Sequence, residues 1–225
     1  MEDVDIDFRK IRKIVEENVK RKVELYVQKK LKYSNDVNND IGIINNEKDK
    51  NKSDIEDLTD PRIWNRKGLE LKNLKKFEEA IKCYDKAIEL DPNYLEARNN
   101  KGVVLSLMEK FEEAIKCYDK ALEINPNIPE VWNNKGVALG HLKRYGEEIR
   151  CYNKAIEINP NYPKAYYNKG IALRNLEMYE DAFKTLIKAS ELNPNDMSIW
   201  FELGYTAGYL MRDLEKRIIQ TKRWR

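Results

Sequence analysis

A period of 34 residues governs most of this chain. From Pro61 onwards, four segments of that length align without a gap, namely 61–94, 95–128, 129–162 and 163–196. A repeat of this length is one supersecondary unit that cannot bury its apolar face alone, so neighbouring units must stack to form a continuous core. The chain is therefore predicted to fold as a stacked array of similar units.

The pattern within each unit predicts two helices. The first half repeats an aromatic residue (once arginine), a glycine and a leucine at spacings of four and three, which places them on one helical face. They are Trp64, Arg98, Trp132 and Tyr166; Gly68, Gly102, Gly136 and Gly170; and Leu71, Leu105, Leu139 and Leu173. The second half repeats an aromatic and alanine stripe and ends at a proline, which cannot continue a helix. We name the two predicted helices of a unit helix A and helix B.

These residues and their period are similar to the tetratricopeptide repeat family. The resemblance implies an all-α fold, a right-handed α-solenoid of helix-turn-helix repeats, with four repeats in residues 60–196. A fifth helix A is expected to begin near Met197, where Trp200, Gly204 and Ala207 fit the pattern. Asp213 and Lys216 then replace the aromatic residue and the alanine of helix B, so residues 197–225 are predicted to form a partial fifth repeat and a capping helix.

Two further segments precede the repeats. Residues 34–59 are rich in Asn, Asp, Lys and Ser and poor in large apolar residues, so they are predicted to form a flexible linker. Residues 1–33 are predicted to contain a separate amphipathic helix, because an apolar residue recurs every three or four positions, at Phe8, Ile11, Val15, Val19, Val23 and Tyr26. This helix could fold back on the array, pair with a second copy of the chain or bind a partner.

The resemblance implies that the A helices line a concave groove. Its chemistry would then come from the fifth, sixth and ninth residues of each unit: Asn65, Arg66, Leu69, Asn99, Asn100, Val103, Asn133, Asn134, Val137, Tyr167, Asn168 and Ile171. An amide both donates and accepts hydrogen bonds, so a ladder of asparagines can bind the backbone of an extended peptide, while the apolar ninth residues take its side chains. The alternative is that the sixth-position asparagines belong to the general family pattern and serve local helix contacts.

Some eukaryotic members of the family grip the terminal carboxylate of chaperone tails with Lys, Asn and Arg side chains from three repeats. Asn134 and Lys164 match two positions of that clamp. Asn99, Val103 and Asn168 stand where Lys, Asn and Arg are required. Binding of chaperone tails is therefore disfavoured.

Lysines occupy the seventh position of every unit, where the family usually has an apolar residue: Lys67, Lys101, Lys135 and Lys169. Their stems can cover apolar surface while each ammonium reaches water or a nearby Glu. An anion-binding stripe is the alternative.

Glu148 breaks the alanine pattern of helix B in the third unit. A buried carboxylate without a partner is costly, so either the helices are splayed there or Glu148 meets a cation such as Lys143 or Arg144. The third unit is accordingly predicted to be looser than its neighbours.

No set of catalytic residues is recognised in the sequence. His141 is the one histidine, and Cys83, Cys117 and Cys151 recur at the repeat interval, so they are expected to be free thiols of a reducing compartment. We expect no catalytic residue, no metal site and no cofactor, and predict that the chain is not an enzyme. The acidic amino terminus and the lack of a long apolar stretch favour a cytoplasmic protein without a membrane partner.

The sequence thus favours a protein–protein interaction scaffold that binds a peptide segment or a helix of a partner protein in the groove. A self-associating structural assembly protein, a homo-oligomer formed through the amino-terminal helix, is the alternative. RNA binding is less favoured, because related RNA-reading arrays typically keep a 35-residue register and this groove offers only Arg66, Lys164 and Arg174 as charges.

Overall fold

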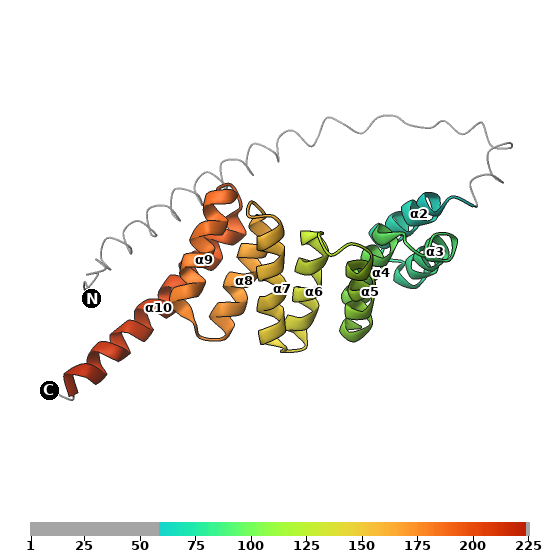
Figure 1. The fold of residues 1–225 in the computed structure, drawn as a ribbon. Helices are drawn as coiled ribbons and strands as arrows, with labels where there is room; N and C mark the ends of the chain where they lie inside the picture. Colours follow the sequence, from blue (N-terminus) through green and yellow to red (C-terminus); the bar gives the residue numbers. More distant parts are fainter. Residues whose placement is uncertain (1–58, 224–225) are drawn as a thin grey trace, which may run out of the picture. The chain divides into compact units, whose positions relative to one another are not determined.

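The computed structural model describes residues 59–223, and the predicted amino-terminal helix and linker lie outside the described residues. The described part is all α-helical, an α-solenoid of helix-turn-helix repeats (Figure 1). Its helices are α2 (Pro61–Asn73), α3 (Phe77–Leu90), α4 (Leu95–Leu107), α5 (Phe111–Ile124), α6 (Pro129–His141), α7 (Tyr145–Ile158), α8 (Pro163–Asn175), α9 (Tyr179–Leu192) and α10 (Met197–Arg223). The even-numbered helices are the A helices, and α3, α5, α7 and α9 are the B helices.

The described residues belong to two compact units. Residues 59–168 belong to the first, which contains α2 to α7 and the start of α8. Residues 169–223 belong to the second, which contains the end of α8 together with α9 and α10.

Each A helix of the four repeats ends in the same backbone turn. After α2, Lys75 takes a left-handed conformation with φ of 60°, and the amides of Lys75 and Lys76 bond the carbonyls of Lys72 and Leu71 at 2.9 Å. This is a Schellman cap, which uses two of the carbonyls that a helix end leaves unpaired. The corresponding residues Glu109, Lys143 and Glu177 have φ of 59°, 58° and 60°. The turn reverses the chain so that helix B packs antiparallel to helix A.

A side-chain hydrogen bond ties the start of an A helix to the proline connection before it. The indole nitrogen of Trp132 donates to the carbonyl of Pro126 at 2.8 Å, and that of Trp200 donates to Pro194 at 2.9 Å. The guanidinium of Arg98 makes the same bond to the carbonyl of Pro92 at 2.7 Å. This shared function explains why arginine can replace the aromatic residue in the second repeat, since both side chains carry a long apolar body and an N–H donor.

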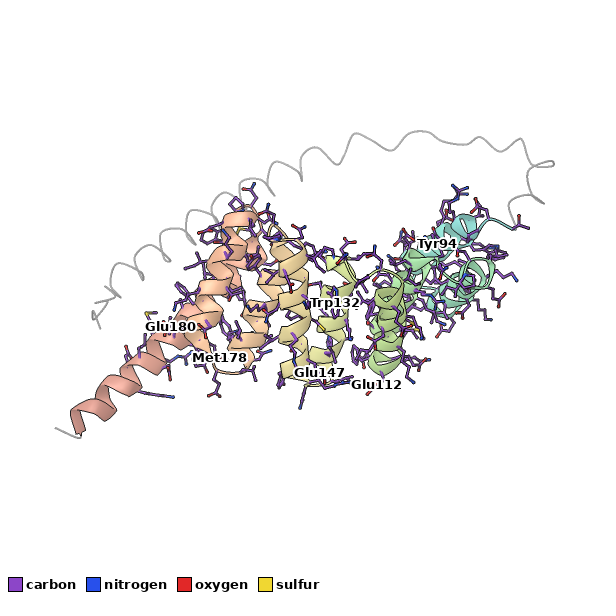
Figure 2. All side chains as sticks on the ribbon, viewed as in Figure 1. Tyr94, Glu112, Trp132, Glu147, Met178 and Glu180 are labelled. Carbon is purple, nitrogen blue, oxygen red and sulfur yellow. The ribbon has the colours of Figure 1, made fainter. Side chains whose placement is uncertain are left out.

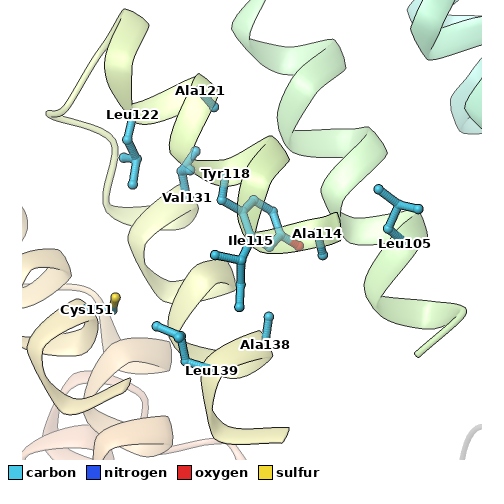
Figure 3. Close-up of a cluster of buried hydrophobic side chains, with 10 residues drawn as sticks. All are labelled: Leu105, Ala114, Ile115, Tyr118, Ala121, Leu122, Val131, Ala138, Leu139 and Cys151. Carbon is cyan, nitrogen blue, oxygen red and sulfur yellow. The ribbon is translucent and has the colours of Figure 1, made fainter. Parts of the chain in front are cut away.

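The core of each repeat forms where a glycine of helix A meets a large residue of helix B. A Cβ atom added at Gly68, Gly102 or Gly136 would lie 2.5, 2.6 or 2.6 Å from the ring of Tyr84, Tyr118 or Tyr152. These rings are buried, and burial raises the pKa of Tyr84 and of Tyr118 to about 12. Around Tyr118, aliphatic side chains of α4, α5 and α6 form one cluster (Figure 3). The core of the second repeat is therefore continuous with that of the third.

Candidate functional site

The asparagines of the predicted groove pair with one another between repeats. The side-chain amide nitrogen of a sixth-position asparagine donates to the amide oxygen of the fifth-position asparagine one repeat earlier. The three bonds are Asn100 to Asn65 at 2.9 Å, Asn134 to Asn99 at 3.1 Å and Asn168 to Asn133 at 2.8 Å. The structure thus brings the two predicted positions together as a row of amide pairs, which holds adjacent A helices in register.

The pairing leaves part of the amide hydrogen-bonding capacity unused. Each pair consumes one N–H and one oxygen lone pair, whereas two side-chain amides together carry four N–H donors and four lone pairs. Asn65 and Asn133 are buried, and Asn99, Asn100, Asn134 and Asn168 are half-buried. The row therefore stabilises the array and still presents donors and acceptors at its half-buried members.

The other predicted groove positions differ in their exposure. The ninth residues of the four units, Leu69, Val103, Val137 and Ile171, are all half-buried, so each presents some apolar surface. Arg66, at the sixth position of the first unit, is exposed, and Tyr167, at the fifth position of the fourth unit, is half-buried. We call the fifth, sixth and ninth residues of the units the A-helix face.

Two of the four seventh-position lysines reach back to the preceding repeat. Lys101 Nζ lies 2.5 Å from the carboxylate of Asp85, and Lys135 Nζ lies 2.6 Å from that of Asp119. Lys135 also lies over the ring of Trp132, 5.5 Å from its centroid. The stems are largely buried, as expected for snorkelling side chains, but the partner is an aspartate of the preceding helix B. These two ammonium groups therefore join repeats.

We predict that the pair between Lys135 and Asp119 contributes measurably to stability. Lys135 is 20% exposed and Asp119 is 43% exposed, so water screens the pair only in part. A double-mutant cycle of Lys135→Met and Asp119→Asn, measured by urea unfolding, should give a coupling energy of about 0.5 to 1 kcal/mol. The same cycle on the exposed pair of Lys154 and Glu157 serves as the control and should give about 0.3 kcal/mol. Equal coupling in the two cycles would contradict this assignment.

Glu148 of the third repeat is buried and accepts a hydrogen bond from a tyrosine. The Tyr152 hydroxyl donates to Glu148 Oε1 at 3.2 Å, and the guanidinium of Arg144 bonds Glu147 at 2.7 Å instead (Figure 2 labels Glu147). The predicted cation partner, Lys143 or Arg144, is therefore wrong. Burial raises the pKa of the Glu148 carboxyl, and the Tyr152 hydrogen bond opposes that rise.

A glycine, not splayed helices, makes room for Glu148. A Cβ atom at Gly140 would lie 2.5 Å from Glu148 Oε1. Gly136 and the Tyr152 ring approach as closely as the matching residues of the first two repeats, so α6 and α7 are not separated. The space for Glu148 could have been predicted from the sequence, since Gly140 stands where the other units have larger residues.

The repeats match models of a known repeat family. One tetratricopeptide repeat model matches residues 61–94, 95–128 and 129–162, and a second matches residues 151–184. Together they span more than half of the chain. The chain belongs to the tetratricopeptide repeat (TPR) family. TPR arrays are in general protein–protein interaction scaffolds without catalytic activity, and this membership indicates a scaffold here.

Solved structures of other TPR proteins share the fold. YrrB, described as a TPR protein with an unusual peptide-binding site, is 25% identical, with a TM-score of 0.57 over 69% of this chain and 80% of YrrB. PilF of Pseudomonas aeruginosa is 25% identical, with a TM-score of 0.63 over 73% of this chain and 72% of PilF. The first TPR of Spaghetti (RPAP3), bound to the HSP90 peptide SRMEEVD, is 30% identical, with a TM-score of 0.51 over 52% of this chain and 93% of that one. None of the curated proteins matches the chain.

The described part of the TPR array has few residues arranged as in a metal site. His141 is exposed and stacks on Phe111 with ring centroids 4.4 Å apart. Across residues 59–223, no group of three or more His, Cys, Asp or Glu side chains is placed to hold a metal ion. The three cysteines are free, and burial raises the pKa of each thiol. None of the helices in this part is both long and apolar enough to cross a membrane.

An aromatic stripe on α10 was missed by the sequence reasoning. Phe201, Tyr205 and Tyr209 lie four residues apart, and Phe201 and Tyr205 are 73% and 46% exposed. Arg174 lies over the Tyr205 ring at 5.2 Å and pairs with Glu202. With Trp200 as the fourth residue of a fifth unit, Phe201 and Tyr205 hold its fifth and ninth positions. The register that defined the A-helix face in four units could have identified them.

Proposed function

We propose that this TPR protein is an adaptor that holds a segment of a partner protein against its A-helix face. The observation that carries the proposal is the row of amide pairs beside half-buried aliphatic residues. The residues proposed to bind are Asn65, Arg66, Leu69, Asn99, Asn100, Val103, Asn133, Asn134, Val137, Tyr167, Asn168 and Ile171.

The spacing of packed helices suits an extended ligand. Packed helices lie about 8 to 10 Å apart, and an extended peptide advances about 3.3 Å per residue. A peptide lying across the A helices therefore meets a new amide pair about every third residue. Because the inter-repeat bonds already fix each amide, binding loses less side-chain entropy than it would with free asparagines.

The comparisons support a peptide ligand without naming one. YrrB and the Spaghetti repeat are both described with a peptide or a peptide-binding site. The HSP90 peptide itself is a poor candidate here, because Asn99, Val103 and Asn168 replace the residues that the carboxylate clamp requires.

A peptide selection tests the proposal on the full chain. We expect a random dodecapeptide library displayed on phage to yield peptides that the wild type binds. Val137→Lys should weaken their binding by at least about tenfold, because it places a charge among apolar contacts. Ile124→Lys makes the same kind of change at an exposed residue at the end of α5 and is the matched control. Failure to select peptides, or equal weakening by both variants, would refute the proposal.

Self-association is a second candidate function, and the exposed α10 stripe favours it. A phenylalanine that is 73% exposed on a helix face next to an exposed tyrosine is an apolar surface that a second copy could cover. Sedimentation of the full chain should then show a dimer that Phe201→Ser converts to a monomer. A monomeric wild type at high concentration would exclude this candidate.

We propose a cytoplasmic location, in keeping with three free thiols. Thiols stay reduced in that compartment, whereas secreted proteins tend to pair their cysteines. Recovery of the protein in a secreted or periplasmic fraction would refute this.

A further inference from the structure

The third repeat departs from the others at two positions that touch. Its twelfth residue is Gly140 and its twentieth is Glu148. The other units carry Lys72, Ser106 and Arg174 at the twelfth position and Ala80, Ala114 and Ala182 at the twentieth. The loss of a side chain on helix A and the gain of a carboxylate on helix B therefore occur together.

The Glu148 carboxylate lies against a residue in line with two members of the A-helix face. Asn133, Val137 and Gly140 are spaced by four and three residues on α6, so they lie along one side of that helix. Glu148 Oε1 lies 2.5 Å from the place where a Gly140 side chain would begin. Next to Gly140, the polar group of the third repeat is therefore the carboxylate of helix B.

This carboxylate is enclosed but not fully satisfied. The Glu148 residue is 7% exposed, and its one hydrogen bond within residues 59–216 is the one that Tyr152 donates to Oε1. Within residues 59–216, no hydrogen bond reaches Glu148 Oε2, and this atom is not one of the fully enclosed side-chain atoms without a partner, Tyr84 Oη and Thr206 Oγ1. A polar group that reaches the Oε2 atom from outside therefore has an open acceptor.

No cation of the described chain compensates the charge of Glu148. None of the ion pairs among residues 59–216 involves it, and the nearby Arg144 is engaged by Glu147. An enclosed carboxylate without a cation is electrostatically unfavourable, and a cation brought by a ligand relieves that cost.

We propose that the Glu148 carboxylate, set against Gly140, is a subsite for a lysine or arginine side chain of the peptide bound on the A-helix face. The inference rests on the proposed function and adds the charge of the ligand to it. The ligand's N–H groups donate to Oε2 while Tyr152 continues to hold Oε1. Charge-assisted bonds of this kind are stronger than neutral ones, so the subsite selects for a cation.

A purely structural role for Glu148 has a clear counterpart in the second repeat. There, the Ser106 and Tyr118 hydroxyl groups lie 3.3 Å apart, so a small polar side chain provides the hydrogen-bond partner of the tyrosine hydroxyl. If Glu148 only supplied a hydrogen-bond partner for the Tyr152 hydroxyl, any side chain with an acceptor oxygen at this position would do the same. Glutamine keeps that acceptor and removes the charge, so Glu148→Gln separates the two roles.

The experiment uses the full-length wild type, Glu148→Gln and Glu147→Gln, each challenged with the same displayed library of random dodecapeptides. The wild type should enrich peptides with Lys or Arg at one fixed position. For one selected peptide, replacing that cation by norleucine should raise Kd about tenfold for the wild type and leave it nearly unchanged for Glu148→Gln. Glu147→Gln, an exposed neighbour on the same helix, should behave as the wild type does.

Three outcomes decide the matter. Loss of the cation preference in Glu148→Gln alone supports the subsite, provided that both variants unfold within about 3 °C of the wild type. Peptides selected without a cation preference, or a preference that Glu148→Gln retains, overturn the subsite and leave the proposed function standing. If the wild type selects no peptide, the proposed function fails and the subsite fails with it.

Discussion

Replacing Tyr118 by alanine should lower the free energy of unfolding by about 3 to 5 kcal/mol, the range found when large aromatic residues are removed from protein cores. The ring is 1% exposed and packs between helices A and B of the second repeat (Figure 3). The void left behind cannot be filled by Gly102, which has no side chain. Urea unfolding followed by circular dichroism measures the loss.

Tyr118→Phe is the matched control for that variant. It keeps the ring and removes only the hydroxyl that lies 3.3 Å from Ser106 Oγ, so we expect a loss of about 1 kcal/mol. Similar losses for the two variants would mean that the hydroxyl, and not the packing of the ring, stabilises the repeat.

Replacing Gly102 by alanine should lower the free energy of unfolding by about 1 to 3 kcal/mol, although alanine is the better helix former by about 1 kcal/mol. The added Cβ would lie 2.6 Å from Cε1 of Tyr118, a buried ring that has little room to move. Gly146→Ala is the control, because a Cβ at Gly146 meets nothing within 4 Å, and it should be neutral or slightly stabilising.

The effect of Gly102→Ala on the free energy of unfolding should also depend on whether the Tyr118 ring is present. In a Tyr118→Ala background the clash is gone, so Gly102→Ala should become neutral or stabilising. If Gly102→Ala costs the same free energy with and without the Tyr118 ring, the contact between them is not the reason for the glycine.

The repeat pattern predicted the fold well because each unit packs its helix A and helix B with residues at the same positions. The 34-residue period predicts a helix A and a helix B in each of the four units, and both are present in every one. The glycine of helix A was predicted to let a neighbouring helix approach, and the Tyr118 ring confirms a close approach at Gly102. Residues 1–58 lie outside the described part, so the predicted amino-terminal helix stays a prediction.

The candidate site was less accessible to sequence reasoning, since its chemistry depends on contacts between units. The asparagines could be selected from the repeat pattern, but their pairing across 35 residues, as between Asn65 and Asn100, follows from the stacking of A helices. The predicted cation partner of Glu148 was wrong, because Arg144, a cation close to it in the chain, pairs with Glu147 instead. The space at Gly140 and the Tyr152 hydroxyl become apparent only when α6 and α7 are packed.

An NMR titration would show where a bound peptide lies on the TPR array. The full chain labelled with ¹⁵N would be titrated with one peptide from the display selection. We expect the largest chemical-shift changes at the side-chain amides of Asn99, Asn100 and Asn134 and at the backbone amides of Val103 and Val137. Changes confined to the B helices, or to residues 201–209 of α10, would contradict the proposed function.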